Sequence, residues 1–281
     1  MNLFQQIAKV FGQVRQKNPL VQHLTNVVTI NDCANAVLAI GATPIMTSSE
    51  QETADLARQA KAVLLNIGTP DEFSEAAMLA AGRAANASGI PVVLDPVGVG
   101  ATPFRHELVS TILRELQIAI IRGNLAELQC IAGDHDAAAT RGVDSVAVEG
   151  DSNAEVARRV ARRYRCIAAI TGAVDCISDG VSLVAMRNGH ILMRQVTGTG
   201  CMTSSLCATC IGAAPEQPLL TACAGVAAMS VAGEIAYADL REGEGTGSYR
   251  RRIIDTLSTL TPKRLESQLR LDQATDKSIR N

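Results

Sequence analysis

Short apolar runs alternate with longer amphipathic stretches along most of the chain. The apolar runs predict strands at 43–46, 62–67, 91–94, 118–121, 145–148 and 167–170. The stretches between and around them have helical spacing and predict helices at 1–17, 31–40, 48–60, 71–88, 103–116, 126–132, 153–163 and 249–260. Apolar strands that alternate with helices are typical of a mainly parallel sheet covered by helices on both faces. The pattern therefore predicts an α/β fold.

The pattern changes after residue 180. Two apolar runs, 181–186 and 190–196, flank Arg187-Asn-Gly189, and Asn-Gly is a strong signal for a tight β-turn. This part of the chain predicts a late antiparallel hairpin. No linker or internal repeat interrupts the remainder, so we predict a single domain over 1–262. The polar residues 263–281 are expected to form a mobile tail.

Composition narrows the class of protein. The chain has 281 residues, a formal net charge of −2 and only 2% aromatic residues, so it has neither the basic surface nor the rings typical of nucleic-acid binding. The apolar stretch 219–233 is shorter than the roughly 20 residues of a membrane span and predicts a buried helix. The first 17 residues lack the solid apolar run of a secretory signal. Together with eight scattered cysteines, this predicts a cytoplasmic protein with free thiols, no membrane partner and no nucleic-acid partner.

A glycine-rich turn lies between the second strand of the predicted hairpin and a predicted helix at 201–212. Its sequence is Gln195-Val-Thr-Gly-Thr-Gly-Cys201. Free backbone N–H groups and the positive end of the helix dipole meet at such a turn, which makes it a ready anion site. Gly198 and Gly200 allow close approach of the backbone. Cys201 lies in the first turn of the helix, where a thiolate is stabilised. A structural turn with a buried cysteine is the alternative.

Polar side chains stand where the predicted strands end. In an open parallel sheet, ligands bind outside the carboxyl ends of the strands. The residues at these ends are Gly68, Asp95, 122–127 and Thr171. Asp95 ends a buried strand, where a carboxylate is costly unless it is paired or bound to a metal. It could also cap the turn before Pro96.

The spacing of Asn124 and Glu127 permits two interpretations. Asn-x-x-Glu is the spacing of a helix capping box. The same spacing directs both side chains to the top of the sheet, where an Mg²⁺–phosphate group would accept them. Arg122 is a fitting phosphate partner, or else a surface ion pair.

These motifs resemble a known family. The turn resembles the Gly-Thr-Gly-Asp anion hole of the ribokinase-like superfamily, to which the Asn-x-x-Glu motif also belongs. The chain resembles the hydroxyethylthiazole kinase family of thiamine salvage, and the matching motifs occur in the same order from about residue 20 to about residue 260. The motifs are Asn26, Pro44-Ile-Met46, Asn66-Ile-Gly-Thr69, Leu94-Asp-Pro-Val-Gly98, Arg122-Gly-Asn-Leu-Ala-Glu127, Ile170-Thr-Gly172 and the turn. The resemblance implies a ribokinase-like three-layer sandwich.

The resemblance also implies roles for single residues. ATP is bound by Arg122, Thr171 and Asn124. The thiazole alcohol is bound by Gly198 and the backbone N–H of Met46, with Asn26 and Gly68 lining its pocket. Mg²⁺, the cofactor, is organised by Asp95 and Glu127. Cys201 takes the place of the aspartate base of related kinases and, with Gly198 and Gly200, completes the catalytic turn. A homotrimer with active sites at subunit interfaces is also implied.

The implied reaction is transfer of the γ-phosphoryl group of ATP to the primary hydroxyl of 4-methyl-5-(2-hydroxyethyl)thiazole. A sister kinase that acts on a hydroxymethylpyrimidine-type alcohol would share the phosphate site. A hydrolase with Cys201 as nucleophile would need a partnered histidine, and no motif around His23, His106, His135 or His190 provides one. A non-catalytic nucleotide-binding protein is the remaining alternative.

Overall fold

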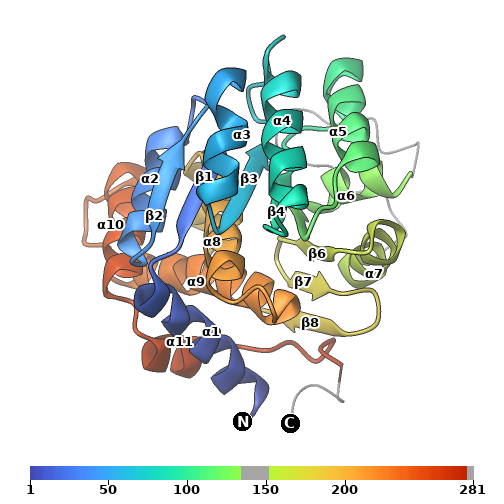
Figure 1. The fold of residues 1–281 in the computed structure, drawn as a ribbon. Coiled ribbons are helices and arrows are strands. Elements are labelled where there is room, and N and C mark those ends of the chain that lie inside the picture. Colours follow the sequence, from blue (N-terminus) through green and yellow to red (C-terminus); the bar gives the residue numbers. More distant parts are fainter. Residues whose placement is uncertain (134–151, 277–281) are drawn as a thin grey trace.

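Eight strands form one sheet at the centre of the fold, in the order β2-β1-β3-β4-β5-β6-β7-β8 (Figure 1). The computed structural model describes residues 1–133 and 152–276. The strands are β1 (Leu20–Leu24), β2 (Thr43–Met46), β3 (Ala62–Asn66), β4 (Val92–Asp95), β5 (Ile120–Gly123), β6 (Ile167–Ile170), β7 (Asp175–Ser178) and β8 (Leu183–Met186). The strands β1 to β6 are parallel, and β7 and β8 are antiparallel to their neighbours. The predicted α/β fold is confirmed.

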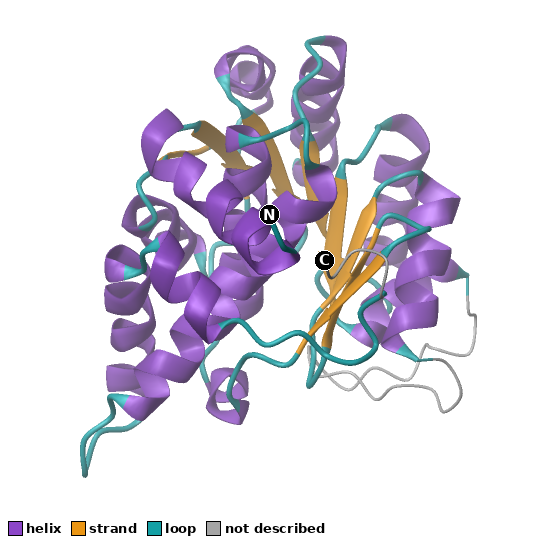
Figure 2. Cartoon of the chain, turned by 90° about the horizontal axis from the view of Figure 1, so that it is seen from below, coloured by secondary structure: helices purple, strands orange, loops and turns teal. Residues whose placement is uncertain are grey.

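Helices cover both faces of the sheet, which makes three layers (Figure 2). One face packs on α1 (Leu3–Lys17), α2 (Ile30–Ala39), α8 (Thr199–Ala213), α9 (Pro218–Ala238), α10 (Thr246–Thr259) and α11 (Pro262–Gln268). The other face packs on α3 (Glu50–Gln59), α4 (Ser74–Ala87), α5 (Pro103–Glu115), α6 (Leu125–Ala132) and α7 (Asn153–Tyr164). Neighbouring strand residues point to opposite faces, so Leu64 packs in the first core and Leu65 in the second.

Helix α9 is longer than the sequence predicts. It is the one helix of the described residues that is long and apolar enough to cross a membrane, yet most of it is buried inside the fold. It packs against α1, α8 and α10 as a core helix, and its small residues let these helices approach closely. Glu234 lies within the helix, and its carboxylate accepts hydrogen bonds from Asn188 and from the N–H of Gly189.

The predicted late antiparallel hairpin is present, but its two strands are not the ones predicted. Strand β8 pairs with β7 on its N-terminal side, so that Asp175 lies opposite Met186. Residues Ile191–Gln195, predicted as the second hairpin strand, form a 3₁₀ helix. Asp179 and Gly180 close the observed turn, since the Asp179 carboxylate accepts the N–H of Ser182 and Gly180 has a φ of +94°.

The free edge of β8 is taken by a later segment of the chain. Leu271 forms an antiparallel bridge with Met186, and the N–H of Asp276 donates to the carbonyl of Leu183. This segment follows α11, a helix the sequence analysis did not predict, which begins at the capping hydroxyl of Thr261. Strands β1 and β7 were also not predicted, and the predicted strand 145–148 lies outside the described residues.

Candidate active site

The carboxyl ends of the six parallel strands meet at one edge of the sheet, and most of the predicted site residues lie there. Asn66 and Asp95 are the last residues of β3 and β4 and lie side by side in the register. Arg122 lies in β5, and Thr171 follows β6. Helix α8 begins at the same edge, since its residue Ser204 bonds to Asp95. The sheet therefore brings together polar groups that are far apart in the sequence.

Asp95 is the buried centre of this cluster. Its Oδ2 accepts hydrogen bonds from Asn66 Nδ2 at 2.9 Å and from Ser204 Oγ at 2.7 Å. Its Oδ1 is buried and has no hydrogen-bond partner among the described residues. Burial raises the pKa of Asp95, and Arg122, whose Nη1 lies 3.9 Å from Oδ2, opposes that shift. An oxygen left without a partner in a buried position is expected where a ligand completes the site.

Arg122 connects Asp95, at the centre of the cluster, with Thr171, which follows β6. Its side chain is only 11% exposed, and its guanidinium donates to the hydroxyl of Thr171. A Cβ added to Gly200 would lie 2.7 Å from Nη1, so the first turn of α8 is in direct contact with this guanidinium. Arg122 Nε has no hydrogen-bond partner in the described part of the chain. Arg122 and Thr171, predicted to bind ATP, and Gly200, predicted to be catalytic, are thus brought together.

The start of α8 has free amides. Gly198 is the residue before the first helical turn, with a φ of +89°, and offers no side chain to cap the helix. A Cβ here would lie 2.6 Å from the Cγ2 of Thr29. Only glycine adopts this φ at little cost, and only glycine fits against Thr29. The amides of residues 199–201 have no partner within the helix, which is the arrangement that the predicted anion site requires.

Asn26 organises the other side of the cluster. Its Nδ2 donates to Asn66 Oδ1 at 3.0 Å and to Cys201 Sγ at 3.3 Å. Its Oδ1 accepts from both the N–H and the hydroxyl of Thr29. The N–H of Gly68 donates to Asn66 Oδ1, and a Cβ on Gly68 would lie 2.8 Å from the Cβ of Asn26. Three residues predicted for acceptor binding and catalysis, Asn26, Gly68 and Cys201, therefore share one corner.

The thiol of Cys201 is not activated as the sequence suggested. Cys201 is the third residue of α8, close to the positive end of the helix dipole. Burial and the nearby Asp95 carboxylate nevertheless raise the pKa of the thiol. These two effects outweigh the hydrogen bonds from Thr29, Asn66 and Asn26, which lower it. The expectation of a stabilised thiolate is therefore wrong.

The capping-box interpretation of Asn124 and Glu127 is confirmed, and the Mg²⁺–phosphate interpretation stays a prediction. The capping box is present, because Asn124 Oδ1 accepts from the N–H of Glu127 and Glu127 Oε2 accepts from the N–H of Asn124. The second carboxylate oxygen, Oε1, accepts from the N–H of Gly98 at 2.9 Å. Burial and Asp95 raise the pKa of Glu127 to about 7. The cap therefore holds a buried carboxyl beside Asp95.

Asp175 and Ser204 are site residues that the sequence analysis missed. Asp175 begins β7, and its carboxylate accepts from the N–H of Gly172 and from the hydroxyl of Ser230, both at 3.0 Å. Burial raises the pKa of Asp175 to about 6. Asp175 thus fixes the loop that follows Thr171. The one feature of the sequence that could have indicated Asp175 is its position as an acidic residue at the start of an apolar run.

Met46 stands apart from this cluster. It is the last residue of β2, the edge strand, and pairs in the register with His23 of β1. Strand β1 therefore separates Met46 from Asn66 on β3. The structure places Met46 at the edge of the sheet where the other predicted site residues lie, two strands away from Asn66.

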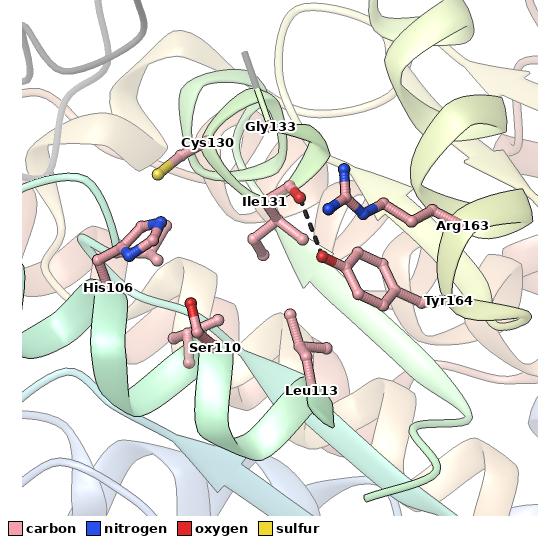
Figure 3. A pocket seen from close by; sticks show the side chains of 10 residues that line it. His106, Ser110, Leu113, Cys130, Ile131, Gly133, Arg163 and Tyr164 are labelled. Carbon is pink, nitrogen blue, oxygen red and sulfur yellow. Dashed lines mark hydrogen bonds between the residues drawn. The ribbon is translucent and has the colours of Figure 1, made fainter. Parts of the chain in front are cut away.

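A cavity of about 240 Å³ lies elsewhere, between α5, α6 and α7 (Figure 3). Its wall includes His106 and Ser110 of α5 and Arg163 and Tyr164 of α7. Tyr164 donates to the carbonyl of Ile131 and Arg163 to that of Ala132, so these groups hold the end of α6. The cavity contains none of the predicted site residues.

The sequence profile of the hydroxyethylthiazole kinase family matches residues 11–263. A hydroxyethylthiazole kinase from Alkaliphilus metalliredigens is 45% identical over 254 residues, which are 90% of this chain and 92% of that relative.

Solved structures are also similar to this chain, among them that of a hydroxyethylthiazole kinase protein. The structure of a hydroxyethylthiazole kinase protein from Pyrococcus horikoshii superposes with a TM-score of 0.84 at 33% identity and covers 95% of this chain and 98% of that one. A ribokinase-like superfamily protein from Enterococcus faecalis superposes with a TM-score of 0.60 at 13% identity, over 92% of this chain and 89% of that one. This second likeness concerns the fold alone, and it confirms the predicted ribokinase-like sandwich.

Proposed function

Because the chain belongs to the hydroxyethylthiazole kinase family, we propose that it transfers the γ-phosphoryl group of ATP to the primary hydroxyl of 4-methyl-5-(2-hydroxyethyl)thiazole. One observation in the structure supports this most strongly. The uncapped start of α8 touches the guanidinium of Arg122, which faces the buried carboxylate of Asp95. Phosphoryl transfer needs positioning and charge neutralisation more than covalent chemistry, and these groups provide both.

The triphosphate is assigned to the space between the amides of 199–201 and the two carboxyl groups. Arg122 and Thr171 lie on its nucleotide side, with Asn124 as a further ATP contact. Asn26, Gly68 and Cys201 surround the acceptor hydroxyl, and Gly198 and Met46 belong to the thiazole side. Oriented N–H groups and a guanidinium in a buried corner stabilise charge on the moving phosphoryl group.

The carboxyl groups fit Mg²⁺. This ion is usually bound by one or two carboxylates together with substrate phosphates and water. The free Oδ1 of Asp95 is a buried oxygen with the chemistry of a magnesium ligand, and Glu127 lies beside it. No group of three or more metal-binding side chains occurs in 1–133 and 152–276. Mg²⁺ would neutralise phosphate charge there.

We propose that Cys201 positions the acceptor hydroxyl. Its thiol carries its proton at neutral pH, because its pKa is raised, and a protonated thiol is a poor general base. A loose transition state asks little of the base, so the enzyme can work without one at this position.

A carboxylate in place of this thiol is expected to keep or raise turnover. In Cys201→Asp, Asn26 can still donate to residue 201, and we expect kcat to stay level or rise by up to about tenfold. Cys201→Ala removes the polar atom and should lower kcat about tenfold. Steady-state kinetics of both variants provide the test. A folded but inactive Cys201→Asp would show that this position requires the shape of the thiol and not a proton acceptor.

The dependence of the reaction on Mg²⁺ is expected to change with pH near 7. Glu127 has a pKa of about 7, so below this pH the ion must compete with a proton. The Mg²⁺ concentration for half-maximal rate should therefore rise by up to about tenfold for each pH unit below 7. Glu127→Gln should remove this dependence. ATP also titrates in this range, but it does so equally for both enzymes, so the difference between them reports on Glu127. Equal pH dependence in the two enzymes would exclude Glu127 from the metal site.

The substrate assignment is tested by an ADP-release assay with Mg²⁺, ATP and the thiazole alcohol, beside a hydroxymethylpyrimidine alcohol. We expect release with the thiazole alcohol and little with the pyrimidine. The reverse preference would indicate the sister kinase. ATP-dependent thermal protection without ADP release would indicate a non-catalytic nucleotide-binding protein.

We also propose a homotrimer with active sites at subunit interfaces, in the cytoplasm. Val27 and Val28 follow the same strand as Asn26 and are 76% and 61% exposed, which leaves an apolar surface beside the candidate site. Sedimentation equilibrium should give three times the chain mass of 29.6 kDa. A monomer mass with full activity would exclude shared sites.

A further inference from the structure

Arg105 lies next to the candidate active site but has no place in the chemistry described so far. It is the third residue of α5, a helix that begins at Thr102 and Pro103. The hydroxyl of Thr102 accepts the N–H of Arg105 at 3.3 Å, which fixes the start of the helix. The helix thereby directs the arginine side chain toward the carboxyl ends of β3 and β4.

The guanidinium of Arg105 binds three backbone carbonyls. Nη1 donates to the carbonyl oxygens of Ile67 at 2.6 Å and Val97 at 2.8 Å, and Nη2 donates to that of Gly68 at 2.9 Å. Two of these carbonyls follow β3 and the third follows β4. The planar fork of an arginine can hold several acceptors in fixed directions, which a lysine ammonium cannot do. Arg105 therefore fastens two loops of the site to each other.

Each of the two loops serves a different part of the proposed reaction. Gly68 lies against Asn26, on the side of the acceptor alcohol. Val97 precedes Gly98, whose N–H binds the carboxylate of Glu127 on the side of the metal. Arg105 donates hydrogen bonds directly to both loops.

We propose that Arg105 is a positioning residue that sets the distance between the acceptor alcohol and the metal-bound phosphate. It does so by holding the 67–68 loop and the 97–98 loop in one arrangement. Because phosphoryl transfer depends on the alignment of these two groups, a displacement of about 1 Å is expected to cost about 10²-fold in rate. This inference rests on the proposed kinase activity.

The test compares Arg105→Lys and Arg105→Ala with wild type in the ADP-release assay. Arg105→Ala should lower kcat about 10²-fold and Arg105→Lys about tenfold, with smaller changes in both KM values. Millimolar guanidinium or methylguanidinium should restore kcat of Arg105→Ala several-fold and leave Arg105→Lys unchanged. Arg114→Ala is the matched control, because Arg114 is an exposed arginine on the same helix. It should keep wild-type kinetics.

The outcomes separate this inference from the proposed function. Wild-type protein without ADP release would overturn the proposed function itself. Active wild type with an Arg105→Lys of equal kcat would overturn the positioning role. Loss of activity that follows only the loss of folded protein, measured by circular dichroism and without guanidinium rescue, would also overturn it, since it would show a structural role alone.

Discussion

Replacing Asp95 with asparagine is expected to lower kcat about 10³-fold while the protein stays folded. The substitution keeps the size of the side chain, and Asn66 and Ser204 remain next to it. It removes the negative charge that faces Arg122 and the buried Oδ1 that has no partner in the described part of the chain. Steady-state ADP release at saturating Mg²⁺ and ATP measures the loss, and circular dichroism confirms the fold.

Asp55→Asn is the matched control for this experiment. Asp55 is a largely exposed aspartate on α3, paired with Arg58 of the same helix. Its replacement should change kcat less than about twofold, because exposed pairs contribute little. An Asp95→Asn protein with near wild-type turnover would remove Asp95 from the catalytic site.

The second large effect is expected from Gly200→Ala. An added methyl group would lie 2.7 Å from Nη1 of Arg122, so either the guanidinium or the start of α8 must move. Both hold the phosphates in the proposed complex. We therefore expect kcat/KM for ATP to fall by about 10²- to 10³-fold, the typical cost of losing one charge-stabilising group.

Gly212→Ala separates a local effect from a general effect of alanine in this helix. Gly212 lies in the last turns of α8, and a Cβ there would make contacts of 3.4 Å with Lys61 and Ala62. This variant should keep kcat and KM for ATP within about threefold, because alanine is also the better helix former. Equal losses in both variants would mean that α8 tolerates no added volume, and Gly200 would then have no special relation to ATP.

Much of the site could be predicted because a parallel sheet brings its strand ends to one edge. Asp95, Arg122 and Thr171 each follow or end an apolar run, so sequence alone placed them together. The glycine turn was equally readable, since Gly198 and Gly200 precede a helix. The resemblance to a family supplied the roles of these residues, which neither spacing nor periodicity contains.

The pairing within the late hairpin could not be predicted, because the partner of β8 is decided by tertiary contacts. The apolar run 190–196 has a strand-like composition, but the edge of β8 is filled by residues 271–276 from the end of the chain. A local turn signal such as Asn188-Gly189 cannot show that a segment about 80 residues later in the chain pairs with β8 instead. In the structure Asn188 bonds instead to Glu234 and to the carbonyl of Gln268.

The ionisation of Cys201 and the hydrogen bonds of Arg105 were also beyond the sequence. A helix start favours a thiolate, yet the burial of Cys201 and the charge of Asp95 depend on packing from other elements. Arg105 binds backbone carbonyls, which every residue has, so no sequence motif indicates these contacts.

The position of the γ-phosphate in a ternary complex tests the central claim most directly. A crystal structure with Mg²⁺, a non-hydrolysable ATP analogue and the thiazole alcohol measures it. We expect the γ-phosphate within hydrogen-bond distance of the amides of 199–201 and of Arg122, with Mg²⁺ on the side of Asp95. A nucleotide bound in the cavity between α5, α6 and α7, with Asp95 and Arg122 free of it, would contradict the account.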